Sequence, residues 1–574
     1  MGKIFSYIRP YVGYICLTLL LKTAGAFAEL GIPWLMESIL SQGAGTGSTG
    51  QIFLYGGLML LCAVLCLALN ISANRMSAKS SGKITLALRH DLFDKLMHLS
   101  ARQMDALTVS SAESRLTSDT YNINQLLARI QRVGVRAPIL LVGGICMMLL
   151  MDAGLALILI ALLPVIALIV YFVTKTTIPL YTRQQGILDR MVRTLQENIT
   201  GIRVIKALSK TEHEKKRFND VNDELSATER KAGSVTSITG PASSLVLNLG
   251  LTLVVLIGGY RVNQGLSESA TLVAFLQFFA MILNAMLGVT RIFIMWSKGE
   301  ASALRVAEVL ALPEDMEPLP PQRPEQHAPH IEFRHVHFSY TGRGDNISNL
   351  SFKLERGQTL GILGATGSGK STLLQLLMRV YDPDSGEIRM DGQDIRTIPP
   401  QELKAKFGVV FQNDFVMEGT VSDNIRFFRD IPEEQLSQAA EYAQAAAFIA
   451  EKEGGMAAEV AVRGNNLSGG QKQRLLIARA LAGDPEILIL DDASSALDYR
   501  TDAMLRAALR GRYRNTTTVL VAQRVSSLRH ADLILMLSDG QVIGSGSHSQ
   551  LMESCEEYRV IAQTQMGDGE EAAL

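Results

Sequence analysis

Six long apolar stretches in the first 300 residues constrain this chain more than any other feature of its sequence. Each approaches or exceeds the roughly 20 residues that an α-helix needs to cross a bilayer. They run over residues 14–40, 52–71, 135–151, 155–173, 243–260 and 271–296. The pattern predicts a multi-pass membrane protein. A cleavable signal peptide is disfavoured, because the first apolar stretch is too long and no small-residue cleavage site follows it.

The overall composition excludes several other classes of protein. Only 19% of the 574 residues are charged, below the roughly 25% of soluble domains. The 55 basic and 56 acidic residues give a net charge of −1, which does not favour a nucleic-acid partner. Five cysteines are too few for a disulfide scaffold in a chain of this length. We therefore expect a membrane protein with a sizeable soluble part.

The charges of the connecting segments predict the orientation. Segments 41–51 and 261–270 carry Arg261 as their one basic residue, whereas 72–136 and 174–240 are long and rich in Lys and Arg. Basic connections stay on the cytoplasmic side of a membrane. We therefore predict that the spans lie in the cytoplasmic membrane and that both long connections and both termini lie in the cytoplasm. In 87–99, leucines recur with helical spacing at 88, 92, 96 and 99, which predicts helices that continue into the cytoplasm.

A proline-rich, polar segment over residues 313–329 predicts a semi-extended linker. It divides the chain into a transmembrane domain over 1–312 and a nucleotide-binding domain over 330–574. After the linker, 330–340 alternates like a strand, and 359–364 is typical of a buried strand that ends in glycine.

That glycine begins a phosphate-binding loop. Residues 364–371 match G-x-x-x-x-G-K-[ST] between the predicted strand and a helical segment. Backbone N–H groups of such a loop converge on phosphate oxygens at a helix N-terminus. Lys370 would reach the β- and γ-phosphates of ATP, and Ser371 would ligate Mg²⁺ together with Asp491, which ends the strand-like segment 486–490. The candidate ATP-binding residues here are Gly364, Ala365, Thr366, Gly367, Ser368, Gly369, Lys370, Ser371 and Thr372.

Between these two motifs lies the sequence LSGGQ at 467–471. With it, the chain resembles an ATP-binding-cassette (ABC) exporter half-transporter of the multidrug or lipid type over essentially its whole length. The resemblance implies an all-α transmembrane domain of six long helices (the type I or type IV exporter fold). It also implies an α/β P-loop NTPase domain with a helical subdomain.

The resemblance also implies roles for further residues. Tyr340 would stack on adenine, Gln412 would sense the metal and the attacking water, and residues 495–498 would form the D-loop. Two such domains face each other head to tail, so one chain's signature contacts the ATP that its partner holds. The signature residues are Ser468, Gly469, Gly470 and Gln471.

Two departures from the family pattern concern hydrolysis. The family's catalytic glutamate is replaced by Asp492 in this chain. The Asp side chain is one methylene shorter, so its carboxylate would stand roughly 1.5 Å back from the attacking water, and such a displacement can lower the rate about 10²-fold. The family's switch histidine is Gln523, which can hydrogen-bond a phosphate but carries no positive charge. Beside an intact Lys370, Ser371 and Asp491, these changes predict a site that binds ATP and hydrolyses it poorly.

The pattern resembles the degenerate subunit of a heterodimeric exporter of hydrophobic or amphipathic substrates. A second half-transporter and the lipid bilayer are the implied partners. A homodimer with two slow sites, and an ATP-gated channel or regulator on the same fold, stay open as alternatives. A further departure is Ala461-Val462, where the family tends to have Gly-Glu, and it bears on how this domain senses the transmembrane helices.

The sequence leaves open the roles of two sets of residues in the predicted spans. Lys22 and Glu29 share one face of the first predicted helix and either mark the translocation path or lie near the interface and snorkel. The membrane methionines either line an adaptable cavity or pack as ordinary core residues. They are Met147, Met148, Met151, Met281, Met286 and Met295.

Overall fold

The fold was analysed in a computed structural model, which describes residues 2–44, 49–313, 327–412, 415–493 and 497–566, and residues 316, 318–322 and 325. The chain forms two compact units. The first comprises Met1–Met97 and Val109–Leu312, and the second comprises His98–Thr108 and Pro313–Leu574. Segment 98–108 lies within the sequence range that we assigned to the transmembrane domain, yet it packs with the nucleotide-binding domain.

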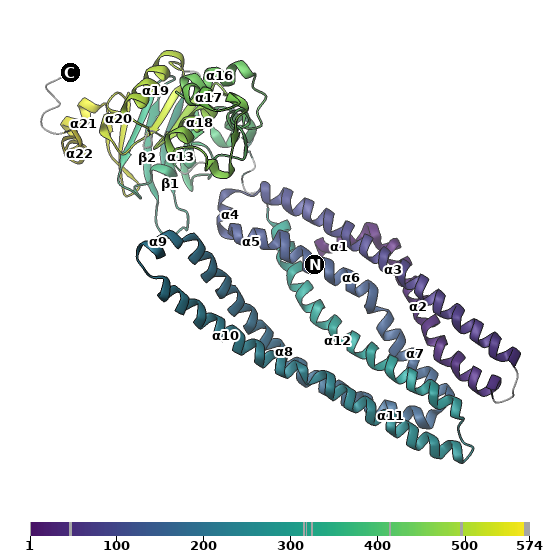
Figure 1. The fold of residues 1–574 in the computed structure, drawn as a ribbon. Coiled ribbons are helices and arrows are strands. Elements are labelled where there is room, and N and C mark those ends of the chain that lie inside the picture. The colour runs from purple at the N-terminus through teal and green to yellow at the C-terminus, as the bar shows by residue number, and fades with distance from the viewer. Residues whose placement is uncertain are drawn as a thin grey trace. The chain divides into compact units, whose positions relative to one another are not determined.

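In the described part of the first unit, every regular element is a helix (Figure 1). Six of its helical segments are long and apolar enough to cross a membrane, in agreement with the sequence. Several run far beyond a bilayer's thickness: α3 has 49 residues and α8 has 48, about 70 Å each at 1.5 Å per residue. The helices are α1 (Gly2–Ile8), α2 (Val12–Ser38), α3 (Thr49–Met97), α5 (Val109–Ser114), α6 (Thr120–Arg129), α7 (Arg136–Met151), α8 (Ala153–Thr200), α9 (Ile202–Ala207), α10 (Thr211–Ser237), α11 (Thr239–Asn263) and α12 (Ser269–Ala311).

The core of this unit forms where α7 and α12 pack together with α2 and the ends of α8 and α11. Phe275, Phe278 and Phe279 of α12 are fully buried there, and so is Met148 of α7. Met148 is therefore a packing residue. The leucine pattern at the end of α3 holds for Leu88, Leu92 and Leu96, which are buried, but α3 ends at Met97 and Leu99 lies beyond it.

The second unit contains two large sheets and a small two-stranded sheet, β7-β8. A six-stranded sheet has the order β12-β11-β3-β10-β9-β6, parallel except for β12, and a four-stranded antiparallel sheet has the order β2-β1-β4-β5. Residues on both sheets share one hydrophobic core with α13. The strands are β1 (Ile331–Phe338), β2 (Ile347–Leu354), β3 (Thr359–Gly364), β4 (Ser385–Met390), β5 (Gln393–Asp394), β6 (Phe407–Val410), β7 (Gly419–Thr420), β8 (Glu459–Val460), β9 (Ile487–Asp491), β10 (Thr517–Val521), β11 (Leu533–Ser538) and β12 (Gln541–Gly546).

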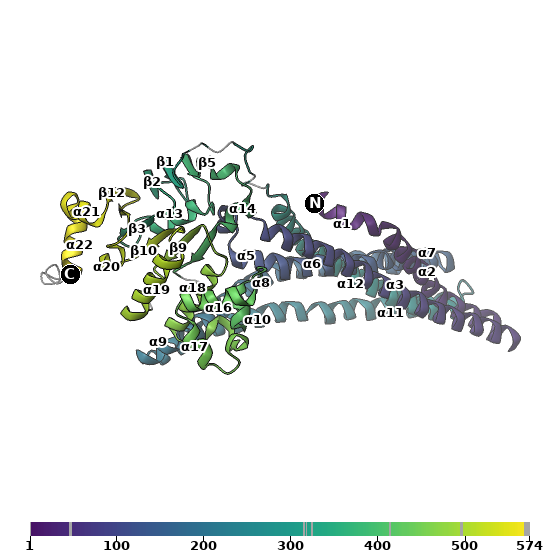
Figure 2. The same ribbon diagram turned by 90° about the horizontal axis from the view of Figure 1, so that it is seen from above.

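Helices of this unit flank the sheets and form a separate helical subdomain. In that subdomain, α16, α17 and α18 lie together in both views and share a second hydrophobic core (Figures 1 and 2). The helices are α4 (Ala101–Leu107), α13 (Lys370–Leu377), α14 (Pro400–Ala405), α15 (Val421–Arg426), α16 (Glu433–Tyr442), α17 (Ala446–Glu451), α18 (Gly469–Leu481), α19 (Tyr499–Arg512), α20 (Val525–Leu528), α21 (His548–Ser554) and α22 (Glu556–Met566). The α/β domain with a helical subdomain therefore agrees with the sequence.

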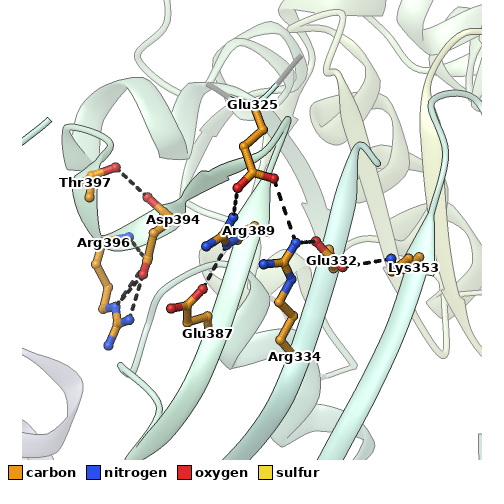
Figure 3. Close-up of polar contacts among 9 residues, drawn as sticks. All are labelled: Glu325, Glu332, Arg334, Lys353, Glu387, Arg389, Asp394, Arg396 and Thr397. Carbon is orange, nitrogen blue, oxygen red and sulfur yellow. Dashed lines mark hydrogen bonds and ion pairs between the residues drawn. The ribbon is translucent and has the colours of Figure 1, made fainter. Parts of the chain in front are cut away.

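Charged side chains cross the antiparallel sheet (Figure 3). Glu332 of β1 is buried, and its carboxylate pairs with Arg334 at 2.7 Å and with Lys353 of β2 at 3.2 Å. These contacts, led by the one with Arg334, lower the pKa of Glu332 below its usual value. Glu325, which precedes β1, accepts a hydrogen bond from Arg389 of β4 at 2.5 Å. The network ties the end of the linker region to the sheet.

Candidate nucleotide-binding site

The predicted phosphate loop connects β3 to α13, as its sequence requires. Two glycines allow this connection. A Cβ atom on Gly364 would lie 2.4 Å from the carbonyl oxygen of Leu537 on the neighbouring strand. Gly369 caps α13 in the left-handed region, with φ +100°, and a Cβ there would meet Ile347 at 2.8 Å. A side chain at Gly364 would require the backbone to move, and one at Gly369 would be strained by the left-handed φ.

Part of the loop is exposed, whereas its lysine side chain folds back onto the loop. Ala365, Thr366 and Gly367 are exposed, whereas Ser368 is 3% exposed, and its hydroxyl has no hydrogen-bond partner within the described part of the chain. The ammonium of Lys370 donates to the carbonyl oxygens of Gly364 at 2.8 Å and Ala365 at 2.7 Å. Burial lowers the pKa of Lys370, while the nearby carboxylates Asp491 and Asp492 oppose that shift. Two carbonyl oxygens of the loop therefore hold the ammonium group next to the exposed residues 365–367.

Oxygen-bearing side chains gather beside this loop. Asp491 ends the buried strand β9 and is 6% exposed, and the backbone N–H of Gln412 donates to its carboxylate. Burial, followed by repulsion from Asp492, raises the pKa of Asp491. Ser371 lies in the first turn of α13, and Thr372 follows it.

A hydroxyl, a carboxylate and an amide form the all-oxygen donor set that Mg²⁺ prefers, with room left for phosphate oxygens. Over the described ranges, no three His, Cys, Asp or Glu side chains cluster as a metal cage would need. The residues present therefore fit a Mg²⁺ ion that is held jointly with a nucleotide.

The two residues that depart from the family pattern contact each other. Asp492 follows β9 and Gln523 follows β10, and these strands are parallel neighbours, so their carboxyl ends meet at one sheet edge. The side-chain amide of Gln523 donates to Asp492 Oδ2 at 3.3 Å. Burial raises the pKa of Asp492, and the charges of Lys370 and Arg524 oppose this rise. The backbone φ of Asp492 is +51°, a conformation that Asp adopts more readily than most residues.

The signature sequence begins a helix in the helical subdomain. Ser468 is the N-cap of α18, and its hydroxyl accepts a hydrogen bond from the backbone N–H of Gln471 at 3.2 Å. The side chain of Gln471 accepts in return from the backbone N–H of Ser468 at 3.0 Å. Ser468 and Gly469 are exposed, and a Cβ on Gly469 would meet nothing within 4 Å. This helix N-terminus is therefore free to receive an anion.

Tyr340, which the resemblance identifies as the adenine-stacking residue, lies over the phosphate-loop helix. Its hydroxyl donates to the side-chain oxygen of Gln375 at 2.5 Å and lies 3.2 Å from the hydroxyl of Thr372. The ring of Tyr381 packs edge-on against it, with centroids 5.2 Å apart. Sequence reasoning missed Tyr381 and Gln375, because nothing in their local pattern marks them.

Segment 98–108 contributes contacts to the region around Tyr340 and Tyr381. Asp105 of α4 accepts a hydrogen bond from the Tyr381 hydroxyl at 2.6 Å. Burial and then this hydrogen bond raise the pKa of Tyr381, so its hydroxyl stays a donor. Arg102 of the same helix donates to the Ser339 carbonyl and pairs with Asp384 at 3.0 Å. A short helix from the connection between the second and third long spans is thus built into the nucleotide-binding unit, close to Tyr340.

Two further sequence motifs can be placed in part. Of the predicted D-loop, Ser495 and Ala496 lie outside the described residues, and Asp498 caps α19 by accepting from the Thr501 backbone N–H. Ala461 and Val462 are exposed just before the signature.

Family models match both parts of the chain. Residues 15–286 match the ABC transporter transmembrane region, and residues 347–495 match the ABC transporter family. The chain belongs to the ABC transporters. The pairing of these two regions in one chain makes it an exporter half-transporter that uses ATP, and its six spans make it a multi-pass membrane protein.

Relatives and a solved structure agree with this assignment. An uncharacterized ABC transporter ATP-binding protein of Mycobacterium tuberculosis (strain H37Rv) is 31% identical over 98% of this half-transporter and 97% of the relative. The ABC transporter ATP-binding protein YfiB of Bacillus subtilis (strain 168) is 32% identical over 99% of each chain. A bacterial Atm1-family ABC exporter with ATP bound has the same fold, with a TM-score of 0.81, 24% identity and coverage of 98% and 99%.

We expect Asp105 to influence ATP affinity through Tyr381 and Tyr340. Asp105→Ala removes the acceptor that holds Tyr381, and the ring of Tyr340 then loses its edge-on support. A hydrogen bond of this kind contributes about 0.5–1.5 kcal/mol, so ATP binding to the full-length half-transporter is expected to weaken roughly two- to tenfold. Fluorescence titration with an ATP analogue measures this. Asp105→Asn keeps an acceptor and is the matched control.

The effect should be confined to the adenine end. Pyrophosphate, which has no base, should bind the Asp105→Ala variant and the unchanged protein alike. Equal weakening for ATP and pyrophosphate, or no weakening for ATP, would show that Asp105 does not act through Tyr340.

Proposed function

We propose that this half-transporter is the degenerate-site subunit of a heterodimeric ABC exporter, located in the cytoplasmic membrane with its nucleotide-binding domain on the cytoplasmic side. It pairs with a second half-transporter whose own site hydrolyses ATP. Together they move hydrophobic or amphipathic molecules outward. This chain binds ATP at its own phosphate loop and supplies its signature sequence to the partner's site.

The observation that carries this proposal is the contact between Asp492 and Gln523 beside an otherwise complete site. The amide of Gln523 occupies one oxygen of Asp492, the carboxylate that would have to polarise water. A neutral amide also supplies no positive charge to the γ-phosphate. Lys370, Ser371 and Asp491 keep the functional groups that hold a nucleotide. The arrangement therefore favours nucleotide retention over hydrolysis.

Each part of the site has a distinct role in this proposal. Tyr340 stacks on adenine, and the N–H groups of residues 364–369 surround the phosphates while Lys370 turns from its two carbonyl partners to the β- and γ-phosphates. Ser371, Asp491 and Gln412 would hold Mg²⁺, and the ion would supply positive charge to the phosphates there. The Ser468 hydroxyl and the N–H groups of Gly469 and Gly470 contact the γ-phosphate of nucleotide on the partner.

ATP binding in both sites would close the two nucleotide-binding domains on each other. Helices built into these domains, such as α4, would carry that closure to the spans and turn the transport cavity outward. Hydrolysis in the partner's site then resets the assembly. Ala461 and Val462 lack the carboxylate that family members place there, so this domain would sense the partner's coupling helix differently.

One relative supports the amphipathic substrate class. The fatty acid ABC transporter ATP-binding/permease protein of Mycobacterium tuberculosis (strain CDC 1551) is 32% identical over 86% of this chain and 78% of the relative. A fatty acid is a single-chain amphiphile, which fits our proposal of a lipid-like substrate.

Co-expression of this chain with its partner is expected to give a 1:1 complex with at least tenfold higher ATPase activity than the chain alone. The reason is that one chain alone can pair only with itself and then has two sites without a catalytic glutamate. Size-exclusion chromatography with light scattering measures the stoichiometry, and phosphate release measures turnover. Full ATPase activity from the purified single chain would instead support the homodimer. Substrate flux without stoichiometric ATP turnover would support the channel.

A further inference from the structure

A group of charged side chains lies inside the helical unit, apart from the nucleotide site. Lys22 of α2 is 3% exposed, and its ammonium donates to the side-chain oxygen of Asn70 on α3 at 2.8 Å. About two turns further along α2, Glu29 pairs with Arg136 of α7. Its carboxylate accepts two hydrogen bonds from the Nη2 atom of Arg136, at 2.7 and 2.9 Å, and a third from the Nε atom. Three helices, α2, α3 and α7, therefore contribute to this group of polar side chains.

The charges in this group do not balance. Arg136 and Arg132 are both close enough to Lys22 to repel its charge, and Glu29 is the carboxylate that attracts it. Glu29 is already engaged by Arg136. Lys22 has no ion pair with any residue that the structure describes. Three cations thus share one carboxylate, which leaves a formal excess of two positive charges.

A hydrogen-bond donor near this group is also unused. The Nε atom of Arg132 is buried and has no hydrogen-bond partner among the residues that the structure describes. Gln131, next to it in the chain, is 3% exposed and accepts a hydrogen bond from Ser80 of α3. Both residues lie in the π-helical turn Ile130–Gly134, and such turns occur frequently at functional sites.

The depth of the group follows from the spans. Asn70 and Arg136 lie at the ends of the second and third apolar stretches that our proposed orientation places at the cytoplasmic surface. Lys22 lies eight residues into the first stretch, about 12 Å along the helix. An amphiphile that enters from the inner leaflet would have to carry its head group about this far into the bundle, with its chain among the spans. Arg136 is 39% exposed and Glu29 22%, so the group is open on one side.

Excess buried positive charge in a membrane is costly unless an anion or water compensates it. From these observations, we propose that Lys22, Arg132 and Arg136 form the head-group site for a transported amphiphile that carries an anionic oxygen head, a carboxylate or a phosphate. Glu29 holds Arg136 in place and limits the excess charge. This inference rests on the proposed export function and names the substrate class for it.

The test uses the full-length chain in the complex in which it purifies, reconstituted in phosphatidylcholine nanodiscs. Saturable binding of tritiated oleate is measured, together with oleate-stimulated ATPase activity. Lys22→Gln keeps a donor for Asn70 and removes the charge. A hydrogen bond to a charged group is worth roughly ten- to a hundredfold in affinity, so oleate binding should weaken by at least tenfold. Lys22→Arg should restore most of it.

Two further variants separate charge from structure. Lys175→Gln removes an exposed lysine from the long helix α8 and should leave oleate binding unchanged. Glu29→Gln releases Arg136 and increases the excess charge, so oleate should bind more tightly, by a few-fold. A merely structural ion pair predicts the reverse, a loss of binding with loss of stability. Weaker oleate binding to Glu29→Gln would therefore overturn the proposal.

Further probes distinguish a transported amphiphile from a resident lipid, and the head-group site from the proposed export function. Oleyl alcohol has the same chain without charge and should compete at least tenfold less well than oleate. If both bind and stimulate equally, amphiphile export stands and the head-group site is wrong. If neither stimulates the ATPase, the proposed substrate class itself is wrong. If phosphatidylglycerol in the nanodisc displaces oleate and oleate does not stimulate, the site holds a resident lipid and the proposal is overturned.

Discussion

Replacing Ser468 by arginine is expected to stop nearly all ATP turnover of the complete transporter, although this chain keeps its own phosphate loop. Ser468 and Gly469, at the start of α18, are exposed. In our proposal they contact the γ-phosphate of ATP on the partner, where charge develops during transfer. Loss of one such preorganised donor typically costs about 10²-fold or more in rate. An arginine also adds bulk and a misplaced cation where the two domains close.

A matched control separates this effect from damage to the helix. Ser468 also caps α18, and the loss of a capping side chain costs about 0.5–2 kcal/mol. Ser468→Thr keeps both the hydroxyl and the cap, so it should retain most turnover. Thermal unfolding of both variants should show that the arginine variant still folds. If Ser468→Thr lost turnover as fully as Ser468→Arg, packing at this position and not the donor would be responsible.

The comparison with Lys370→Ala makes the prediction specific to a degenerate subunit. Lys370 serves nucleotide bound to this chain, so its loss should lower turnover only in part. A self-contained ATPase would show the opposite order, because its phosphate-loop lysine matters most. Steady-state phosphate release from the three complexes decides the order. If Lys370→Ala is the more damaging change, this chain carries the hydrolytic site.

The main outlines of the fold could be predicted because they depend on local patterns. Apolar length predicts spans, and each of the six apolar stretches lies in a long helix. Strand alternation before Tyr340 and the glycine-rich loop before Lys370 likewise depend on neighbouring residues, and β1, β3 and α13 form there. The ends of helices were harder to predict. α3 stops at Met97, before Leu99, although the apolar spacing continues, because Ser100 begins a new helix with its own capping box.

The rest depends on contacts between residues that are distant in the sequence. Asp105 and Tyr381 are 276 residues apart, and only folding shows that α4 belongs to the nucleotide-binding unit. The spacing of Lys22 and Glu29 showed that they share a helix face, but not that Asn70 and Arg136 are their partners. The sequence motifs identified Asp492 and Gln523 as two separate departures from the family pattern. Their contact follows from the pairing of β9 with β10, which a single sequence does not reveal.

Restoring the two family residues at this contact is expected to give the chain's own site hydrolytic activity. Asp492→Glu lengthens the side chain by one methylene and brings its carboxylate roughly 1.5 Å closer to the water, which can recover up to about 10²-fold in rate. Gln523→His removes the amide that engages Asp492 and supplies a group that can carry positive charge toward the γ-phosphate. The double variant should therefore gain more than either single change.

The gain is measurable only where the partner's site is silent. With the catalytic glutamate of the partner replaced by glutamine, the complex should hydrolyse ATP slowly, and adding Asp492→Glu with Gln523→His should raise phosphate release by at least tenfold. Asp492→Asn is the control: in the otherwise unchanged complex it should alter turnover little, because this carboxylate contributes little. The backbone φ of +51° suits Asp better than Glu, so the variant should also lose about 1 kcal/mol of unfolding free energy. A large loss of turnover from Asp492→Asn would mean that both sites hydrolyse ATP, and the assignment of this subunit as degenerate would then be wrong.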